Sequence, residues 1–221
     1  YIGRDDFIGS FLQRDLPQLG VGVPPETLYR FWRMLAHLHG QLFNASQIGG
    51  ALGGVAHTTV ARYLDIMIDT MMVRRLEPHF VNIGKRLIKA PKIYIRDSGL
   101  LHALLNVREV VDLQGHPASG ASWEGFVLEQ IVAYAPTGAD ITFYRTAAGS
   151  ELDVLVSHGR YRIGFEIKFS VAPKPARGFW QAIEDTKVDQ AYVVAPVENA
   201  YPLAANVEVI PVRDLSTVFR K

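Results

Sequence analysis

A glutamate, a lysine and an aspartate have the side-chain types and the spacing that metal-assisted phosphate chemistry requires. Glu166 and Lys168 lie two positions apart in residues 161–169, which are rich in β-branched and aromatic side chains and are therefore predicted to form a strand. Residues two apart on a strand share a face, so the carboxylate and the ammonium should lie together. Asp153 lies in the preceding predicted strand, residues 152–156, and reaches the same place if the turn sets it opposite Glu166.

Two carboxylates and an ammonium at one strand end suit a divalent cation and a phosphoryl group. Mg²⁺ prefers oxygen ligands, and a metal ion with a neighbouring cation can oppose the negative charge that develops during phosphate hydrolysis. The residues therefore predict that Asp153 and Glu166 hold Mg²⁺ or Mn²⁺ beside Lys168. The alternative is a half-buried salt bridge without chemistry, because alternating charges on the wet face of a strand are common.

The strands on either side of residues 157–159 are predicted to form a β-hairpin. Ser157, His158 and Gly159 have turn chemistry. The residues that alternate with Glu166 and Lys168 are hydrophobic, and they should point into a core. These residues are Phe165, Ile167 and Phe169.

Length and composition indicate one large domain or two small ones. The chain has 221 residues, of which 48% are hydrophobic, and no run of eighteen hydrophobic residues that could span a membrane. It has no cysteine, which excludes disulfides and thiolate zinc sites and fits a cytoplasmic location. The sequence begins at Tyr1 without an initiator Met or a leader pattern, so we expect a piece of a longer gene product.

Charge is distributed unevenly along the chain. Residues 1–97 contain 12 Lys and Arg against 8 Asp and Glu, whereas residues 98–221 contain 11 against 14. The basic part is therefore a candidate surface for nucleic acid, and the acidic part is a candidate location for a metal site.

Residues 1–110 are predicted to form a helical domain with a winged helix. The order and lengths of the predicted elements are typical of a helix-turn-helix: a helix at 44–52, a turn at Gly53-Gly54 and a second helix at 58–72. Strands at 73–76 and 87–90, around a turn at 82–85, would form the wing. The candidate contacts to DNA phosphates are Arg62, Arg74, Arg75, Lys85, Arg86 and Lys89. The alternative is a winged helix that only packs against a neighbouring domain.

Residues 111–221 are predicted to form an α/β domain with a central mixed sheet and flanking helices. A long helix should begin at Ser122 and a further strand at Ile141, ahead of the hairpin. The remaining predicted elements are a helix at 177–184, strands at 191–194 and 207–210, and a short helix at 214–219.

The second domain resembles the PD-(D/E)xK nuclease superfamily, which has a restriction-endonuclease-like fold. Members place an acid on the first helix, an Asp on the second strand, E-x-K on the third strand and sometimes a Gln on the next helix. The matching positions are Glu124, Asp153, Glu166 with Lys168, and Gln181. Leu152 stands where the proline of the motif would be.

The resemblance implies metal-dependent hydrolysis of phosphodiester bonds. Asp153 and Glu166 would hold Mg²⁺ or Mn²⁺ together with the carbonyl of Ile167, and Lys168 would polarise or deprotonate the attacking water. Glu124 would hold a second metal or orient a water, and Gln181 would complete the catalytic set.

The whole chain resembles the C-terminal region of a prokaryotic AAA+ ATPase family. The stretches that carry this likeness are residues 11–16, 82–92, 94–101, 123–127, 144–146 and 151–153. The resemblance implies that an ATPase module precedes Tyr1 in the parent protein. The chain itself has no G-x-x-x-x-G-K-[ST] motif and therefore no P-loop for ATP.

Three functional hypotheses follow. The first is a DNA-cleaving domain joined to a winged helix and driven by an ATPase. The second is a catalytically inactive module of the same fold that binds DNA or a partner protein. The third is a purely structural domain that serves in oligomerisation.

Overall fold

The computed structural model describes residues 2–81 and 84–220, which belong to two compact units. The first unit comprises Tyr1–Arg75 and Lys92–Ser122, and the second comprises Leu76–Pro91 and Trp123–Lys221. The sequence placed the division between residues 110 and 111. In the structure the chain instead enters the second unit at residue 76, returns at residue 92, and leaves the first unit after residue 122.

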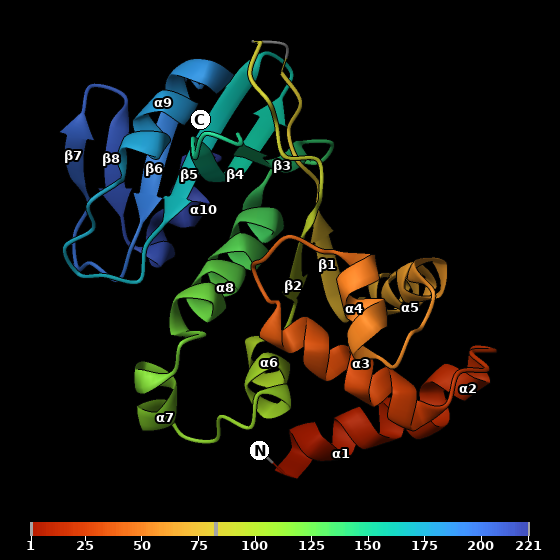
Figure 1. Cartoon of the computed structure of the whole chain (residues 1–221). Helices are drawn as coiled ribbons and strands as arrows, with labels where there is room; N and C mark the ends of the chain where they lie inside the picture. Colours follow the sequence, from red (N-terminus) through yellow and green to blue (C-terminus); the bar gives the residue numbers. More distant parts are fainter. Residues whose placement is uncertain (1, 82–83, 221) are drawn as a thin grey trace. The chain divides into compact units, whose positions relative to one another are not determined.

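The first unit is helical, with one small sheet (Figure 1). Pro25 lies at the first position of helix α3 (Pro25–His37), where a missing N–H costs no hydrogen bond. The hydrophobic residues of this helix fall at helical spacing on one face and are almost completely buried: Leu28, Phe31, Trp32 and Leu35. The helical elements of the unit are α1 (Ile2–Ser10), a π-helical turn (Phe11–Asp15), α2 (Leu16–Gln18), α3 (Pro25–His37), α4 (Ala45–Ala51), α5 (His57–Asp69), α6 (Ser98–Leu104) and α7 (Val110–Gly115).

Helices α4 and α5 pack closely around a glycine turn. The side chain of Asn44 caps α4 by accepting a hydrogen bond from the N–H of Gln47. Gly53 and Gly54, between the helices, both have φ of +88°, a conformation that favours glycine. A Cβ at Gly49 would clash with the carbonyl of Val55, so this position of α4 also requires glycine. The predicted pair of helices with a glycine turn is confirmed.

The small sheet differs from the predicted wing. Strand β1 (Val73–Leu76) lies where a strand was predicted, but it pairs with β2 (Lys92–Ile95). The strand predicted at residues 87–90 is wrong, because these residues make only an isolated bridge, between Leu87 and Thr146. Of the predicted turn at residues 82–85, Asn82 and Ile83 lie outside the described residues.

The second unit contains a six-stranded mixed sheet with strand order β3-β4-β5-β6-β8-β7 (Figure 1). Neighbouring strands are antiparallel in the pairs β3-β4, β4-β5 and β7-β8, and parallel in β5-β6 and β6-β8. Its elements are β3 (Asp140–Arg145), β4 (Glu151–His158), β5 (Tyr161–Ile167), β6 (Gln190–Val194), β7 (Tyr201–Ala204), β8 (Val207–Ile210), α9 (Arg177–Thr186), a 3₁₀ turn (Val212–Asp214) and α10 (Leu215–Val218). Helix α8 (Ser119–Tyr134) begins in the first unit and continues into the second.

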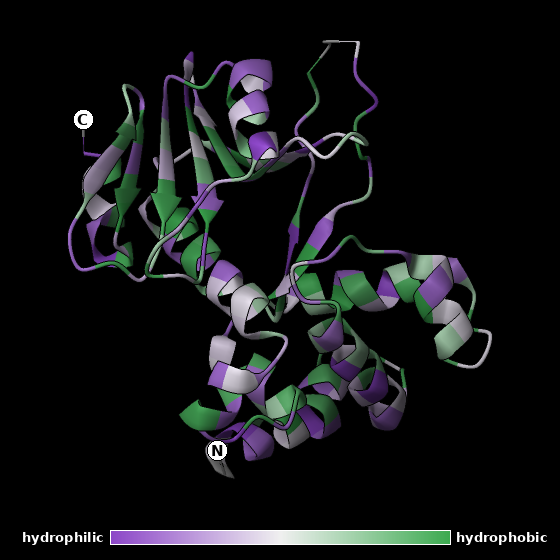
Figure 2. Cartoon of the chain, turned by 60° about the vertical axis from the view of Figure 1, so that its left-hand side comes forward, coloured by the Kyte–Doolittle hydropathy of each residue, from purple (hydrophilic) through white to green (hydrophobic). Residues whose placement is uncertain are grey.

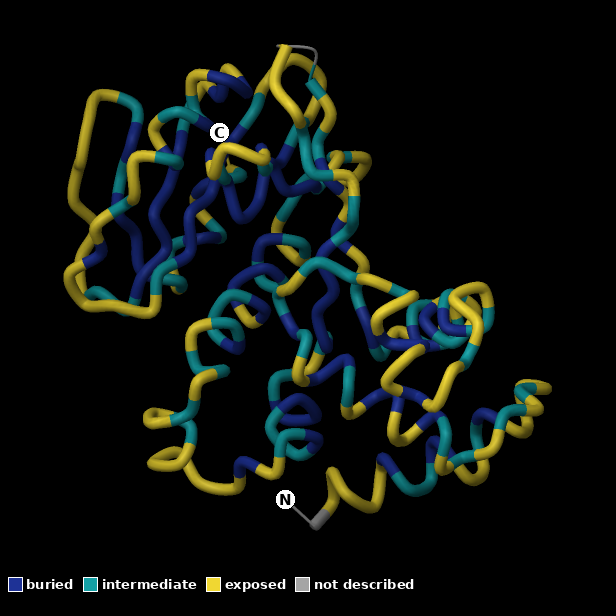
Figure 3. Tube along the Cα trace, viewed as in Figure 1, coloured by how far each residue is buried: buried dark blue, intermediate teal, exposed yellow. Residues whose placement is uncertain are grey.

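The two faces of the sheet have different partners. Phe179 and Ala182 of α9 pack with Leu155 and Val193 on one face. On the other face, Phe165 stacks on Tyr192 and contacts Phe219, which follows α10, with ring centroids 5.8 and 6.0 Å apart. Figure 2 shows that the central strands are largely hydrophobic, and Figure 3 shows them buried, whereas the edge strand β7 is exposed.

The chain between β1 and β2 forms an arm, residues 77–91, that covers the edge of β3. Backbone hydrogen bonds join Glu77 and His79 to Phe143, and two more run from the Ile88 N–H to the Arg145 carbonyl and from the Ala147 N–H to the Arg86 carbonyl. An uncovered edge strand leaves N–H and C=O groups unpaired. The arm therefore completes the sheet of the second unit.

A buried carboxylate fixes the arm to α9. Both oxygens of Asp185 accept hydrogen bonds from the Lys85 ammonium, at 2.6 and 2.7 Å, and one oxygen accepts another from the hydroxyl of buried Tyr144, at 2.8 Å. Burial raises the pKa of Asp185, but the hydrogen bonds from Lys85, Tyr144 and Gln181 outweigh burial, so the net pKa is lowered. Lys85 thus anchors the arm, a role that its sequence position did not indicate.

Replacing Lys85 by methionine is expected to loosen the arm. The variant removes the charged donor and leaves Asp185 buried with only neutral donors. Amide hydrogen exchange should accelerate by about 10-fold or more at Ile88 and Ala147, consistent with the loss of about 1.5–3 kcal/mol that a hydrogen bond to a charged group contributes. Lys89→Met, at an exposed site in the same arm, is the control. Equal exchange in the two variants would show that Lys85 does not hold the arm.

The fold is mixed α/β, with an N-terminal helical region and a small hairpin, followed by a six-stranded mixed sheet with flanking helices. Helix α7 and strand β7 have no counterpart among the elements predicted from the sequence. Strand β7 contains Pro202, which is tolerated because β7 lies at the edge of the sheet. Among residues 2–81 and 84–220, no helix has the length and hydrophobicity needed to cross a lipid bilayer.

Candidate active site

The β4-β5 hairpin sets Asp153 opposite Glu166. The two strands are antiparallel, and Val154 pairs with Phe165, so continuing the register by one residue matches Asp153 to Glu166. Directly opposite residues of an antiparallel pair project from the same face. Gly159, with φ of +61°, lies in the turn between the strands. The predicted hairpin is confirmed, and it brings the two carboxylates together.

Both carboxylates are buried, and each has a partner. Glu166 is 5% exposed and Asp153 is 9% exposed. The ammonium of Lys168 lies 2.6 Å from Oε1 of Glu166, and the N–H of Ile167 donates a 2.8 Å hydrogen bond to Oδ2 of Asp153. The three residues chosen from the sequence therefore meet at the start of β4 and the end of β5.

The electrostatics of the site reveal an excess of negative charge. Burial raises the pKa of Glu166, and Glu151 and Glu124 raise it further, against the opposing effect of Lys168. Burial lowers the pKa of Lys168, but its hydrogen bond to Glu166 and the charges of Glu166, Asp153 and Glu124 outweigh burial, so the net pKa is raised. Both groups bind a proton more readily than in water. Lys168 is therefore an ammonium, and the carboxylates of Glu166, Asp153 and Glu124 set a negative potential around it.

Glu124 and Glu151 complete this acidic environment. Glu124 lies in α8, the helix on which the resemblance implied an acid, although the helix begins at Ser119 and not at Ser122. Glu151 was not chosen from the sequence. It starts β4, with its carboxylate 3.5 Å from the guanidinium of Arg145. Its spacing of two from Asp153 on a strand was the signal that could have identified it.

The donor set fits a hard divalent cation with few protein ligands. Among the described residues, no three His, Cys, Asp or Glu side chains are grouped closely enough to hold a metal ion together. Asp153 and Glu166 provide two adjacent carboxylates, and Mg²⁺ commonly uses one or two carboxylates and keeps several waters. These two side chains are therefore the candidate metal ligands. A direct ligand role for Glu124 stays a prediction.

Gln181 lies on α9, and its amide belongs to the Asp185 network. Its Nε2 donates hydrogen bonds of 3.3 Å to Glu184 and to Asp185, both on the same helix. Its place in the catalytic set stays a prediction.

Phe169 corrects the predicted hydrophobic face of the second strand. Phe165 and Ile167 are buried as expected, but β5 ends at Ile167 and Phe169 is 51% exposed. Its ring centroid lies 5.8 Å from that of Trp123, which in turn lies 5.9 Å from that of Phe126. An aromatic cluster therefore adjoins Lys168 and Glu124 in the chain.

The six basic residues chosen as phosphate contacts are divided between the units. Arg62, Arg74 and Arg75 belong to the first unit, and Lys85, Arg86 and Lys89 belong to the arm in the second. Arg75 lies 3.3 Å from Asp65, and Lys85 is bound to Asp185. The predicted wing is therefore not a feature of the first unit, because the arm belongs to the second unit, where Lys85 pairs with Asp185 of α9 and the backbone of Arg86 and Ile88 bonds to Ala147 and Arg145.

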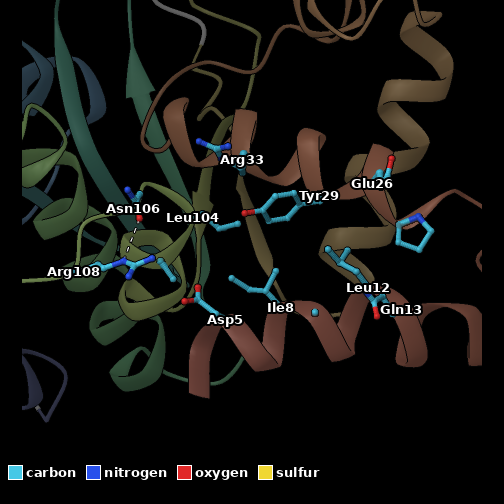
Figure 4. Close-up of a pocket in the computed structure, with 13 residues that line it drawn as sticks. Asp5, Ile8, Leu12, Gln13, Glu26, Tyr29, Arg33, Leu104, Asn106 and Arg108 are labelled. Atoms are coloured by element: carbon cyan, nitrogen blue, oxygen red, sulfur yellow. Dashed lines mark hydrogen bonds between the residues drawn. The ribbon is translucent and has the colours of Figure 1, made fainter. Parts of the chain in front are cut away.

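The first unit contains a pocket of about 600 Å³ between α1, α3 and the end of α6 (Figure 4). Ile8, Leu12 and Leu104 contribute hydrophobic side chains, and Tyr29 points across the pocket toward Leu104. The charged residues that line it are Asp5, Glu26, Arg33 and Arg108. No sequence pattern indicated this pocket, because its lining comes from three separate segments.

Comparison with known proteins relates the chain to two domain families. Residues 2–110 match a domain of unknown function, DUF8612, and residues 119–215 match a second domain of unknown function, DUF4143. The uncharacterized proteins Mb2031c of Mycobacterium bovis and Rv2008c of Mycobacterium tuberculosis are each 45% identical over 215 residues, which is 97% of this chain and 48% of theirs. The chain thus spans about half the length of these relatives. No solved structure gave a significant match. The chain therefore contains one region similar to the DUF8612 family and a following region similar to the DUF4143 family, and it is similar in sequence to about half of a longer mycobacterial protein.

Proposed function

We propose that the second unit is a metal-dependent nuclease domain that hydrolyses phosphodiester bonds in DNA. The observation that carries the proposal is the meeting of buried Asp153, buried Glu166 and Lys168 at adjacent ends of β4 and β5. The pKa of Lys168 supports it, because the charges of Glu166, Asp153 and Glu124 raise this pKa against burial and would also attract a metal ion. The arrangement agrees with the resemblance to the PD-(D/E)xK superfamily.

Each side chain has a distinct role in the proposed reaction. Asp153 and Glu166 would hold Mg²⁺ or Mn²⁺, which supplies a polarised water and neutralises charge on the scissile phosphate. Lys168, as an ammonium, would orient the water and stabilise the negative charge that develops on the phosphate oxygens. Glu124 and Glu151 would maintain the negative potential that attracts the ion. Buried Phe165, on the opposite face of the same strand, holds β5 in place.

The first unit and the longer parent protein extend this proposal. The pair α4 and α5 would form a helix-turn-helix that contacts DNA phosphates through Arg62, Arg74 and Arg75. The parent protein would be an AAA+ ATPase, with the ATP-binding module in the part of the relatives that this chain does not span. The salt dependence of DNA binding would report the phosphate contacts.

The test is a cleavage assay on plasmid and single-stranded DNA with Mg²⁺, Mn²⁺ or EDTA. The parent chain should nick DNA only with metal, and Asp153→Asn should reduce the rate by about 10³-fold or more, because it removes a metal ligand. Asp140→Asn, at an exposed acid on β3, is the matched control and should retain activity. Cleavage that persists in EDTA, or in Asp153→Asn, would refute the proposed mechanism.

A second candidate function is a catalytically inactive module that binds DNA or a partner protein. Two observations favour it. Lys168 already forms an ion pair with Glu166, and the described residues contain no group of three metal-ligating side chains. DNA binding without cleavage under every metal condition would favour this function.

A further inference from the structure

The loop after β5 and the start of α9 carry exposed aromatic and cationic side chains that no predicted function uses. Phe169 is 51% exposed and Trp180 is 38% exposed. Lys174 and Arg177 lie between them and are also exposed. Residues 167–183 contain no Asp or Glu. We refer to Phe169, Lys174, Arg177 and Trp180 as the aromatic-cationic strip.

Topology sets this strip at the same end of the sheet as the candidate active site. Phe169 follows Lys168 directly at the end of β5, and this end of β5 lies beside the start of β4, where Asp153 is found. Helix α9 begins beside the turn that precedes β4, because a Cβ at Gly178 would clash with the carbonyl of Gly149. Both ends of the strip are therefore close in the fold to the strand ends that carry the acids.

The strip is complementary to a polyanion that offers flat aromatic surfaces. None of the ion pairs recorded among the described residues involves Lys174 or Arg177. Proteins that bind unpaired nucleic acid combine such cations with exposed aromatic rings on which the bases stack. In a duplex the bases are already stacked on one another, so exposed rings of this kind gain contacts only with a single strand.

We infer that the aromatic-cationic strip binds a single-stranded segment of nucleic acid and guides it into the Asp153, Glu166 and Lys168 site. The inference rests on the proposed nuclease function and specifies its substrate as an unpaired strand. Phe169 is the residue that stacks next to the scissile phosphate, and Lys174 with Arg177 contacts the phosphates beyond it. Trp123, whose ring adjoins that of Phe169, supports it from α8, and the ring of Phe126 adjoins Trp123 in turn.

The test measures binding in EDTA, where metal-dependent cleavage cannot occur. Fluorescence anisotropy compares labelled oligothymidylate, oligouridylate and a blunt duplex. The variant Phe169→Ala/Lys174→Ala should bind the preferred single strand about 10-fold or more weakly, and its plot of log affinity against log salt should have a slope smaller by about 0.7. The ratio between the two oligonucleotides distinguishes DNA from RNA as the strand that is bound.

The matched control is Tyr161→Ala/Arg160→Ala, at the opposite end of the hairpin. Tyr161 is 48% exposed and Arg160 is exposed, so this variant also removes one aromatic ring and one cation. It should bind within about twofold of the parent. Both variants should unfold at the parent's temperature, because all four residues are exposed or half exposed.

Two single substitutions separate stacking from hydrophobic contact with a partner protein. Phe169→Trp should preserve the affinity, whereas Phe169→Leu should lose it, because leucine keeps the hydrophobic area but has no aromatic face. Parental affinity in Phe169→Leu, equal weakening in the two double variants, or tighter binding to the duplex than to either single strand would overturn the inference.

Failure of the inference can be distinguished from failure of the proposed nuclease function. Metal-dependent cleavage that Phe169→Ala/Lys174→Ala leaves unchanged would refute strand binding by the strip and leave the proposed nuclease function standing. Single-strand binding that depends on Phe169 and Lys174, without cleavage in Mg²⁺ or Mn²⁺, would support strand binding by the strip and refute the proposed nuclease function.

Discussion

Replacing Lys168 by methionine is expected to separate the two functions that meet at the candidate active site. DNA cleavage should fall by about 10²- to 10³-fold, the loss typical when one group that stabilises transition-state charge is removed. Mn²⁺ affinity, in contrast, should stay the same or rise, because the ammonium that lies 2.6 Å from Glu166 no longer competes with the ion. Glu166→Gln should lose both cleavage and Mn²⁺ binding, since it removes a proposed ligand.

Isothermal titration with Mn²⁺ and single-turnover cleavage of labelled DNA measure these two effects independently. Asp140→Asn removes a carboxylate from an exposed position of β3 and is expected to match the parent in both assays. If Lys168→Met bound Mn²⁺ less tightly than the parent, the lysine would have to support the ion and not compete with it. If Glu166→Gln bound Mn²⁺ like the parent, Glu166 would not be a ligand.

The second large effect is a loss of stability in acid that depends on His39. This side chain is 3% exposed in the first unit, and its Nδ1 accepts a 2.9 Å hydrogen bond from the N–H of Ile95. Its ring packs edge-on against Tyr94, with centroids 5.3 Å apart. Burial, which exceeds the other contributions, lowers the pKa of His39 from 6.5 to about 4. Folding therefore keeps the imidazole neutral.

The sign of the effect follows from proton binding. Between pH 6.5 and about 4 the unfolded chain holds a proton on His39 that the folded chain lacks, so the free energy of unfolding falls as the pH falls. The contribution is complete above pH 6.5 and its loss approaches about 3 kcal/mol near pH 4, since each pKa unit corresponds to about 1.4 kcal/mol. His102, whose pKa burial also lowers, adds a change of the same sign.

The measurement is urea unfolding of the whole chain from pH 7 to pH 4, compared between the parent and His39→Asn. Asparagine can offer an oxygen in place of Nδ1 but does not titrate. The stability of the variant should therefore depend less steeply on pH, even if lost packing lowers that stability at pH 7. The comparison with the variant is needed because Glu166, whose pKa is raised, makes the free energy of unfolding rise as the pH falls, opposite to the effect of His39. Parallel pH profiles for the two proteins would exclude His39 as the source.

Much of the candidate site could be predicted because it depends on local pattern. Alternation around Glu166, a turn with glycine at residue 159 and an aspartate in the partner strand together specify a hairpin and its register. Glu151 was recoverable in the same way from its spacing to Asp153. The exposure of Phe169 was not, because alternation does not reveal the residue at which a strand ends.

The arm could not be predicted, because its hydrogen bonds join residues far apart in the sequence. Residues 87–90 have the composition of a strand, and the nearest partner in the sequence is β1, so a local hairpin was the natural interpretation. The actual partner of Ile88 is Arg145, and that of Lys85 is Asp185. Composition can indicate that a segment is extended, but it does not identify a partner that lies 57 or 100 residues further along the chain.

The path of the arm has a consequence for how the protein can be divided and made. A ribosome synthesises residues 77–91 well before β3, so the first-made piece of the second unit must wait for the rest to emerge. A fragment that begins at residue 123 would lack this piece altogether and would present the bare backbone of β3 to other copies, a surface prone to self-association. Expression of residues 123–221 alone should therefore yield aggregates unless residues 77–91 are supplied as a peptide.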